Sequence, residues 1–465
     1  MRPLTLILLT LMLTGCGSLT RSDYQRPLLS VPENWQRTEP QNPILSLEEK
    51  SRWWERFADP RLSRVIGQVL ESNNDLAAAA LTLKQARIAA GLTQTNISPD
   101  VGLNGSGSNS KPLNGGDSQE NYSASLSLSY ELDLWGKLAR IREQSEWEAI
   151  SSEQDYRATI LSTIGTTAQL YWNIALLNQQ MAYQKTSLDI ATQTLAQIES
   201  RQRAGKVGLL DVLQARQTVI SRENAQLNMK QQRTISRNAL AVLLNRPPVQ
   251  HTDEATELDV RQHVAIASVT PLAVLGSRPD LQAAESRLRA ALAGSDAARL
   301  SFYPTLSLQG TLSAGSQIFQ QWFNNPMRAV GSSVGAPFIQ WNTVQLTVEQ
   351  ASLNVQQEAV NFRRTAYTAL SEVDNAMEKR LNADEQRTRL QQSLLLGQQR
   401  LTLTESRYRA GAVDYQTLLN AQDALLDVQN SLAQNQYDYL YATLQLWLAQ
   451  GGNNLQQRTS QNESQ

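Results

Sequence analysis

The sequence contains almost no cysteine, no long hydrophobic run in its body and no excess of either charge. Cys16 is the only cysteine among 465 residues, which excludes any disulfide within the chain. After that cysteine no stretch reaches the ~18 consecutive apolar residues expected of a transmembrane helix. Lysine plus arginine is 42 and aspartate plus glutamate is 43, so we expect no nucleic-acid partner.

Motifs of catalysis and metal binding are also missing. The sequence has no Gly-x-Ser-x-Gly, no phosphate-binding loop and no Cys/His spacing of a zinc site. Its 2 histidines both fall in residues 247–277, and its 6 methionines do not cluster as soft metal ligands would. We therefore expect no enzyme, no catalytic residue, no cofactor and no metal site.

The N-terminus has the pattern of a secreted lipoprotein. A short positive start is followed by an apolar run at 4–13, which is too short to span a bilayer and indicates a signal peptide over residues 1–15. Leu13-Thr-Gly-Cys16 is similar to a bacterial lipobox. The thiol of Cys16 would therefore carry a covalently attached lipid, and palmitate would be among its acyl chains. Gly17, by resemblance to sorted lipoproteins, favours the outer membrane. The alternative is a plain signal peptide with a coincidental cysteine.

The body of the chain is duplicated. Glu199–Val207 returns 206 positions later as Glu405–Val413, with seven of nine residues identical. Upstream the offset becomes 205, where Pro99 corresponds to Pro304, so the two halves differ by almost no insertions. Two copies of one structural unit, set side by side, suggest a wall built by rotation.

Each copy contains a long stretch that predicts one continuous helix. Residues 137–204 and 343–410 have no proline and one glycine each, and their apolar residues recur every three to four positions. At about 1.5 Å per residue such a helix would be roughly 100 Å long. An Arg-Ala-Gly turn and a return stretch, 210–245 or 416–450, follow each of them. We predict two coiled-coil hairpins that pack laterally.

Ahead of each long helix the pattern changes to that of strands. In Tyr122–Tyr130 serines alternate with Ala, Leu and Tyr, giving one polar and one apolar face. We predict strands at about 101–110, 121–134, 305–314 and 329–340. The alternative is a soluble sheet with one wet face, but strands of 9–11 residues suit an outer-membrane barrel. Four strands cannot close one, so the chain would have to oligomerise.

At this point the sequence resembles the TolC-type outer-membrane efflux lipoproteins, the NodT-like outer-membrane factors of resistance-nodulation-division tripartite systems. The resemblance runs from the signal to about residue 450. It is carried by the lipobox, Asp23-Tyr-Gln-Arg-Pro27, Trp53-Trp-Glu-Arg-Phe-Ala-Asp-Pro60, Asn74-Asp-Leu76, Tyr130-Glu-Leu-Asp-Leu-Trp-Gly136 and the doubled Arg-Ala-Gly turns.

The resemblance implies a mainly α protein with a transmembrane β-barrel. Each of two tandem repeats would give two strands and long coiled-coil helices, and a homotrimer would form a twelve-stranded β-barrel and a twelve-helix α-barrel. It would be lipid-anchored in the outer membrane of a Gram-negative bacterium, in contact with membrane lipid, and would extend into the periplasm. The expected segments are 1–15 signal, 16–61 lipidated segment, 62–246 first repeat, 247–277 equatorial connector, 278–450 second repeat and 451–465 tail.

The implied function is that of a passive exit duct. It would carry small toxic compounds, drugs or metal ions, from an inner-membrane pump of the resistance-nodulation-division type and a periplasmic adaptor protein. A duct for type I protein secretion is the alternative, and the lipobox together with the Trp-Trp segment argues against it. A structural coiled-coil lipoprotein or adhesin is a third possibility, which predicts no conductance.

The resemblance also implies that the turns, at about 204–210 and 410–416, dock the adaptor. Val207-Gly208-Leu209 matches the family's Val-Gly-Leu docking pattern, whereas Ala412-Val413-Asp414 departs from it. The alternative is that the two turn glycines only supply a positive φ at a helix end. The expected docking residues are Arg203, Gly205, Val207, Gly208, Leu209, Arg409 and Gly411.

A gate near the tips is implied in the same way. The family pattern Leu-Leu-Asp-Ala-Gln becomes Leu418-Leu-Asn-Ala-Gln422, so Asn420 would form an uncharged ring. Three carboxylates converging on an axis would repel one another and attract cations. The candidates are Asp211, Tyr408, Asp414 and Asn420, with Arg407 or Arg409 as links to Tyr408. The alternative for each is a solvated charge or polar group at a helix end.

Overall fold

The computed structural model describes residues 21–35, 52–248, 253–259, 264 and 270–452, so Cys16 lies outside the described residues. The chain divides into two compact units, to each of which both repeats contribute. Unit 1 consists of Met1–Leu29, Leu81–Gln154 and Leu281–Thr365, and unit 2 of Ser30–Ala80, Asp155–Asp280 and Ala366–Gln465. In the part of the chain that is described, no helix combines the length and apolarity needed to cross a membrane.

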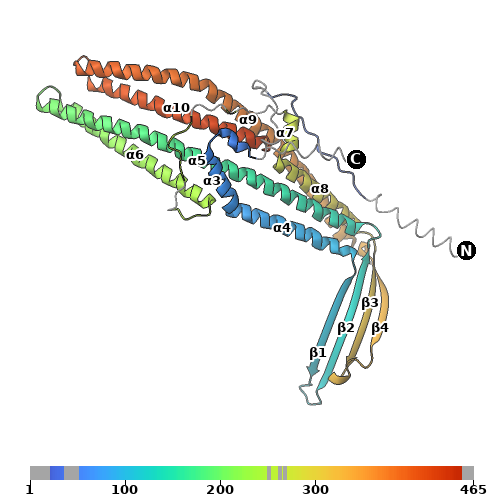
Figure 1. Cartoon of the computed structure of the whole chain (residues 1–465). Helices are drawn as coiled ribbons and strands as arrows, with labels where there is room; N and C mark the ends of the chain where they lie inside the picture. Colours follow the sequence, from blue (N-terminus) through green and yellow to red (C-terminus); the bar gives the residue numbers. More distant parts are fainter. Residues whose placement is uncertain (1–20, 36–51, 249–252, 260–263, 265–269, 453–465) are drawn as a thin grey trace. The chain divides into compact units, whose positions relative to one another are not determined.

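Unit 1 contains one antiparallel sheet with its four strands in sequence order (Figure 1). The first repeat supplies β1 (Asp100–Ser110) and β2 (Gln119–Leu132), and the second supplies β3 (Thr305–Ser316) and β4 (Met327–Gly335). β2 pairs with β3, which joins the two repeats. The expectation of two strands per repeat is confirmed.

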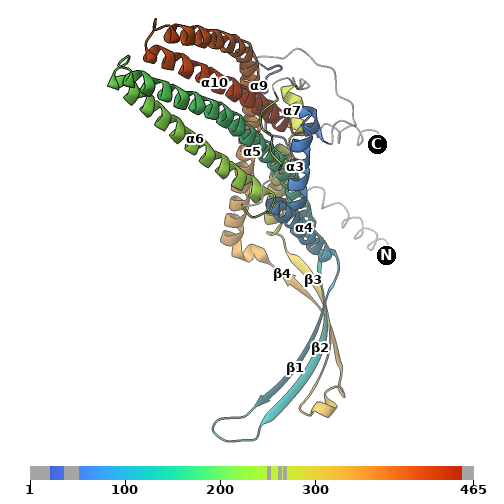
Figure 2. The same cartoon turned by 60° about the vertical axis from the view of Figure 1, so that its left-hand side comes forward.

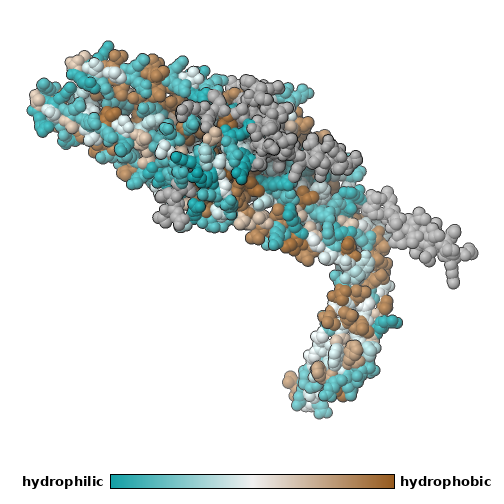
Figure 3. Space-filling view, in the orientation of Figure 1, coloured by the Kyte–Doolittle hydropathy of each residue, from teal (hydrophilic) through white to brown (hydrophobic). Residues whose placement is uncertain are grey.

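The register gives the sheet two unlike faces. Leu103, Leu126 and Leu312 lie opposite one another on the three neighbouring strands. Asn104, Ser125 and Ser313 do the same one position along, on the other face. The leucine face stays exposed in the single chain, and Figure 3 shows hydrophobic side chains gathered on the sheet.

The fourth strand is shorter than the sequence indicated. It ends at Gly335, and a 3₁₀ helix, η5 (Pro337–Gln340), occupies the end of the range predicted as strand. Pro337 has no N–H for the ladder and holds φ near −65°, which favours a helical start over an extended strand. The prediction of strand up to residue 340 is therefore wrong.

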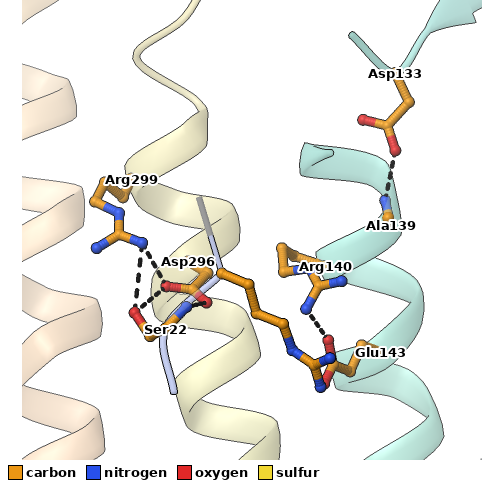
Figure 4. Close-up of polar contacts among 8 residues, drawn as sticks. Ser22, Asp133, Ala139, Arg140, Glu143, Asp296 and Arg299 are labelled. Carbon is orange, nitrogen blue, oxygen red and sulfur yellow. Dashed lines mark hydrogen bonds and ion pairs between the residues drawn. The ribbon is translucent and has the colours of Figure 1, made fainter. Parts of the chain in front are cut away.

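The residues at the end of β2 hold the start of the first long helix, α5 (Lys137–Arg203). Leu138 and Ala139 donate their backbone N–H groups to Asp133 at 2.9 and 2.8 Å (Figure 4). Lys137 pairs with Glu131 at 2.9 Å. A carboxylate at a helix N-terminus satisfies free N–H groups and opposes the positive end of the helix dipole. These residues thus fix the change from strand to helix.

An extended N-terminal segment, residues 21–26, crosses two helices within unit 1. Ser22 donates its N–H and its Oγ–H to the buried Asp296 of α8 (Pro279–Leu300) at 2.8 and 2.7 Å (Figure 4). Arg21 pairs with Glu143 of α5 at 2.7 Å. Arg299 donates to Asp296 at 2.8 Å. The segment is therefore fixed at defined points on α5 and α8.

Two helical hairpins lie side by side in unit 2 (Figures 1 and 2). One is α5 (Lys137–Arg203) with α6 (Leu209–Leu243), and the other is α9 (Trp341–Arg409) with α10 (Tyr415–Ala449). α5 has 67 residues and α9 has 69, and their first turns belong to unit 1. The long helices predicted from the sequence are confirmed.

The Trp-Trp motif forms part of the core of unit 2. It makes a short 3₁₀ helix, η2 (Trp53–Phe57), followed by α3 (Pro60–Ser72). Trp53 stacks on Trp447 of α10 at 5.6 Å, and Phe57 meets Trp172 of α5 edge to face at 4.7 Å. These buried aromatic pairs join η2 to α5 of the first repeat and to α10 of the second repeat.

Two buried arginines cross-link the same unit with fully engaged guanidinium groups. Arg278 pairs with Asp280 and Glu372, each at 2.7 Å. Burial lowers the pKa of Arg278, but the two carboxylates outweigh burial and leave this pKa raised. Arg380 donates to Tyr439 and Thr443, both at 3.1 Å.

The remaining elements are α4 (Asn74–Gln94), α7 (Pro271–Ser277), η3 (Thr95–Ile97) and η4 (Phe319–Gln321).

Candidate docking and gating tips

The two hairpins turn with the same backbone. Gly205 and Gly411 have φ values of 71° and 75°, in the left-handed region that favours glycine. The N–H of Lys206 donates to the carbonyl of Arg201 at 2.9 Å, and that of Ala412 to Arg407 at 2.9 Å. This is a Schellman motif, which satisfies the last carbonyls of the outgoing helix.

The return helices begin differently. Asp414 accepts hydrogen bonds from the N–H of Thr417 at 2.9 Å and from its hydroxyl at 2.5 Å, so it caps α10. These hydrogen bonds lower the pKa of Asp414. The equivalent residue in the first copy, Gly208, has no side chain and α6 has no side-chain cap. The candidate gate residue Asp414 is thus a helix cap on the exposed surface.

A cluster of side chains joins the two hairpins just behind the turns. All four helices contribute, and Tyr408 and Tyr415 lie at its centre with ring centroids 6.4 Å apart. The guanidinium of Arg201 lies over the Tyr408 ring at 4.9 Å. We call this set the tip cluster: Ile198, Val212, Ala215, Tyr408, Tyr415 and Leu418.

Burial in this cluster raises the pKa values of both tyrosines. Desolvation raises the pKa of Tyr408, and the negative charge of Asp211 raises it further, while Arg201 opposes both. Burial also raises the pKa of Tyr415, which a hydrogen bond with Thr218 opposes. Both phenols are therefore neutral at ordinary pH, and the cluster contains no buried negative charge.

The expected docking residues are mostly at the surface. Arg203, Gly205, Gly208, Arg409 and Gly411 are exposed, whereas Val207 is partly buried against the tip cluster. The first tip also exposes three leucines: Leu209 (63%), Leu210 (68%) and Leu213 (52%). Such an apolar group on a surface marks an interaction site more often than a solvated end.

The gate candidates do not form one group. Asp211 lies near Tyr408, but Asn420 is exposed and accepts a hydrogen bond from Gln416 at 2.9 Å. Arg407 and Arg409, expected as links to Tyr408, are exposed. Arg201 occupies that position on the Tyr408 ring instead.

Sequence reasoning missed four residues in and near the tips. Arg201 and Tyr415 belong with Tyr408, and Arg222 of α6 forms an ion pair with Asp423 of α10. Two tyrosines flanking one glycine turn were a signal for the first group. The pair between α6 and α10 left no signal, because its partners lie 201 residues apart.

Among the described residues, no group of three or more histidine, cysteine, aspartate and glutamate side chains could hold a metal ion. The tips offer apolar contact, hydrogen bonding and one buried aromatic cluster. Such a surface can bind a partner protein.

A family model described as outer membrane efflux protein matches residues 65–246 and again residues 271–452. Each match contains one complete hairpin and one pair of strands. The family match therefore follows the internal duplication.

Individual relatives agree with that match. The chain is 30% identical over 468 residues to the pyoverdine export outer membrane protein OpmQ of Pseudomonas putida, with 97% of each chain covered. It is 30% identical over 318 residues to the cation efflux system protein CusC of Escherichia coli, with 68% of each covered. A crystal structure of CusC superposes with a TM-score of 0.80 and 27% identity, over 93% of this chain and 99% of that one.

Proposed function

The chain belongs to the outer membrane efflux protein family, and from that premise we propose that three copies assemble into the exit duct of a tripartite efflux system. It is an outer-membrane efflux component with the TolC-like fold. In this proposal the duct conducts passively and catalyses no reaction. An inner-membrane pump of the resistance-nodulation-division type supplies the energy, and a periplasmic adaptor connects the two.

The observation that carries the proposal is the open sheet of unit 1. Among the residues that the structure describes, β1 and β4 each have only one neighbouring strand, so one row of backbone groups on each has no strand partner there. Inside lipid every such group costs several kcal/mol. Further copies of the chain, joined β4 to β1, satisfy both edges and close the sheet on itself.

The apolar face of the sheet has the height of a bilayer. From Tyr122 to Tyr130 the strand rises ~26 Å at about 3.3 Å per residue, close to the ~25 Å apolar band of outer-membrane proteins. Tyr122 packs against Phe319 with centroids 5.2 Å apart, and at the helix-bearing side Trp135 stacks on Tyr303 at 5.1 Å. Aromatic levels at both ends of an apolar band support contact with lipid.

The helices of unit 1 also have unpartnered edges. α9 exposes Leu346, Leu353 and Val360 at seven-residue spacing, at 66%, 57% and 54%. α4 exposes Leu81 and Ile88 at the same spacing. Heptad repeats of apolar residues need a second helix to cover them, which supports pairing of α9 with α4 of the next copy.

Unit 2 has a similar edge on α6. Leu213, Ile220 and Leu227 repeat every seven residues and are 52%, 57% and 63% exposed. No large hydrophobic residue of α10 is exposed, so the unpartnered stripe belongs to the edge of the hairpin pair. This pattern supports a continuous wall of helices made from several copies.

We assign adaptor docking to the first tip. Its exposed leucines, Leu209 and Leu210, offer an apolar contact next to the Gly205 turn. The second tip presents the Asp414 cap and buries Tyr415, so its surface is polar. The adaptor surface is expected to be apolar where it meets the first tip.

We assign the closed state of the gate to the tip cluster. Opening separates the hairpins, which exposes Tyr408 and removes its cation–π contact with Arg201, worth about 0.5–2 kcal/mol. Asp211 acts through its charge on Tyr408. Asn420 contributes no charge, so we expect weaker cation selectivity than an acidic ring would give.

The exported compounds are proposed only as a class. OpmQ is named for pyoverdine export and CusC for cation efflux, and this chain resembles both. Small molecules and metal ions are therefore both candidates, with the pump selecting the substrate.

Assembly and conduction test the proposal together. The full chain purified in mild detergent should be trimeric by native mass spectrometry, and it should conduct in planar bilayers. Leu353→Glu should shift the population toward monomer, whereas Asn354→Glu, on a neighbouring exposed polar position, should not. A monomeric wild-type protein would contradict the proposal.

The gate has its own test. Replacement of Tyr408 or Asp211 by alanine should raise the single-channel conductance of the purified trimer, because each loosens the tip cluster. Unchanged conductance in both variants would refute this assignment while leaving the duct itself intact.

A further inference from the structure

Unit 1 contains an aromatic groove to which the proposed duct assigns no ligand, although one of its rings, Tyr303, also belongs to the aromatic level described above. Its volume is about 680 Å³, and it lies between the end of α8 and the start of α9. Phe302 and Trp341 meet edge to face at 6.3 Å, and Tyr303 and Trp341 remain 43% and 55% exposed. The lining residues are Arg299, Phe302, Tyr303, Trp341, Gln345, Val348, Glu349 and Ser352.

The groove does not face the neighbouring copy. At about 100° per residue, Leu353 points half a turn away from the buried Val344, so the exposed stripe of α9 is opposite its buried face. Gln345 and Ser352 lie roughly a quarter turn from each. A copy that covers the stripe therefore borders the groove at Glu349, about 40° from Leu353, and leaves the side of Gln345 and Ser352 open. The lining combines an apolar floor with polar groups and with the charged side chains of Arg299 and Glu349 at the edges.

The N-terminal segment ends beside this groove. Ser22 is held by Asp296, and Arg299 both donates to Ser22 Oγ at 3.4 Å and lines the groove. Cys16 precedes Ser22 by six residues, which span at most ~20 Å. The segment upstream of Ser22 is therefore long enough to bring Cys16 to any part of the groove rim.

We propose that the groove binds a fatty acyl chain attached to Cys16. The proposal rests on the outer-membrane function proposed above and on the lipidation of Cys16 that the Leu13-Thr-Gly-Cys16 motif predicts, and it adds a binding site to them. The rings of Phe302, Tyr303 and Trp341 cover the hydrocarbon, which removes apolar surface from water at about 25 cal/mol per Å². The side chains at the rim, Gln345 and Ser352, can donate hydrogen bonds to the ester or amide carbonyl. The acyl chain then fills the space between the end of α8 and the start of α9.

Site-specific photocrosslinking tests the inference in the full chain, expressed with its own N-terminus and purified from the outer membrane. A benzophenone amino acid replaces Ser352, which lines the groove, or Leu353, the adjacent residue on the exposed stripe. After irradiation, mass spectrometry should find Ser352 joined to the acylated Cys16 peptide. Leu353 should instead join a peptide of a second copy.

Four results would overturn the inference. They are an unmodified Cys16, a crosslink from residue 352 only to free phospholipid, a crosslink from it to another copy, or no crosslink at all. Trimer mass and conductance are measured on the same samples. If these are normal while residue 352 misses the lipopeptide, the acyl site is wrong and the duct function stands.

A second variant keeps the test independent of the probe. Trp341→Ala should lower the thermal midpoint of the lipidated protein by more than it lowers that of a non-lipidated Cys16→Ser protein. Both lose the Phe302 contact, but only the former also has an acyl chain to pack. An equal shift in both would mean that Trp341 supports the fold alone, and the inference would fall.

Discussion

The two hairpin tips have the same backbone turn, but they expose different side chains. Position 209 of the first tip and position 415 of the second are equivalent in the repeat, yet Leu209 is 63% exposed and Tyr415 is 3% exposed. The turn itself is set by Gly205 and Gly411 in both copies. The comparison teaches that a duplicated turn can serve two roles when the first residue of the return helix changes.

In the proposed function, that one residue separates the tip that docks the adaptor from the tip that closes the gate. Tyr415 directs its ring into the tip cluster and binds the hairpins together. Leu209 directs apolar surface outward, where a partner can cover it. A chain with two identical tips would have either two exposed apolar surfaces or two buried tyrosine contacts between the hairpins.

The largest expected effect breaks the comparison at this position. Tyr415→Ala should destabilise the tip by about 3–5 kcal/mol, because it empties a buried aromatic site. Hydrogen exchange of the amides in 405–420 should accelerate accordingly. Leu209→Ala, the matched control, should leave exchange unchanged and weaken adaptor binding. Equal effects on exchange in the two variants would mean that the tips are not different.

Arg201 offers the next contrast. Arg201→Ala should favour the open gate by about 1 kcal/mol, roughly a fivefold change in the opening equilibrium, because it removes the cation over Tyr408. Single-channel recording measures this directly. Arg407 is the equivalent residue in the second copy and is exposed, so Arg407→Ala should have no effect. An effect confined to Arg407 would reverse the assignment of the link.

Alkaline pH sharpens the same contrast. The pKa values of Tyr408 and Tyr415 are raised by burial, so their contribution to the closed cluster is complete below the ordinary tyrosine pKa of about 10. It is lost as pH rises from there through the raised values. Conductance should therefore increase above about pH 10. The Tyr408→Phe, Tyr415→Phe double variant should lack this increase, and persistence of the increase would assign it elsewhere.

The smallest expected effect concerns the helix caps. Gly208→Asp gives α6 the cap that Asp414 gives α10 and should stabilise the first tip by a few tenths of a kcal/mol. Asp414→Ala should weaken the second tip, and Asp414→Asn should largely preserve it. Because the pKa of Asp414 is lowered, its contribution is present above the ordinary aspartate pKa and disappears as pH falls through the lowered value. Hydrogen exchange at Thr417 measures the cap, and no dependence on residue 414 would contradict it.

Local features of this protein were readable from the sequence. The strands and long hairpins follow from residue periodicity and from where glycine and proline occur, as at Gly205 and Gly411. The end of β4 was misplaced because an alternating pattern was given more weight than Pro337. The docking residues proposed at the first tip were predicted from a motif and stay a prediction, whereas the exposure of Leu209 and Leu210 is seen only in the structure.

The contacts between hairpins could not be read in this way. Arg201 reaches Tyr408 across 207 positions, and nothing local distinguishes it from Arg407. Likewise a side chain added at Gly165 would meet Leu448 of α10 at 2.6 Å, so that glycine permits close packing. From the sequence it was only an interruption in a helix.

The sequence by itself determined the duplicated strand–helix unit, because backbone conformation depends on sterics and hydrogen bonds among near neighbours. It also determined membership of the family through its motifs. Only the tertiary structure decided which side chains of the two repeats meet, and hence which tip buries the first residue of its return helix and which exposes it. That choice depends on the faces that long helices turn toward one another, and each face is fixed by packing along the whole hairpin.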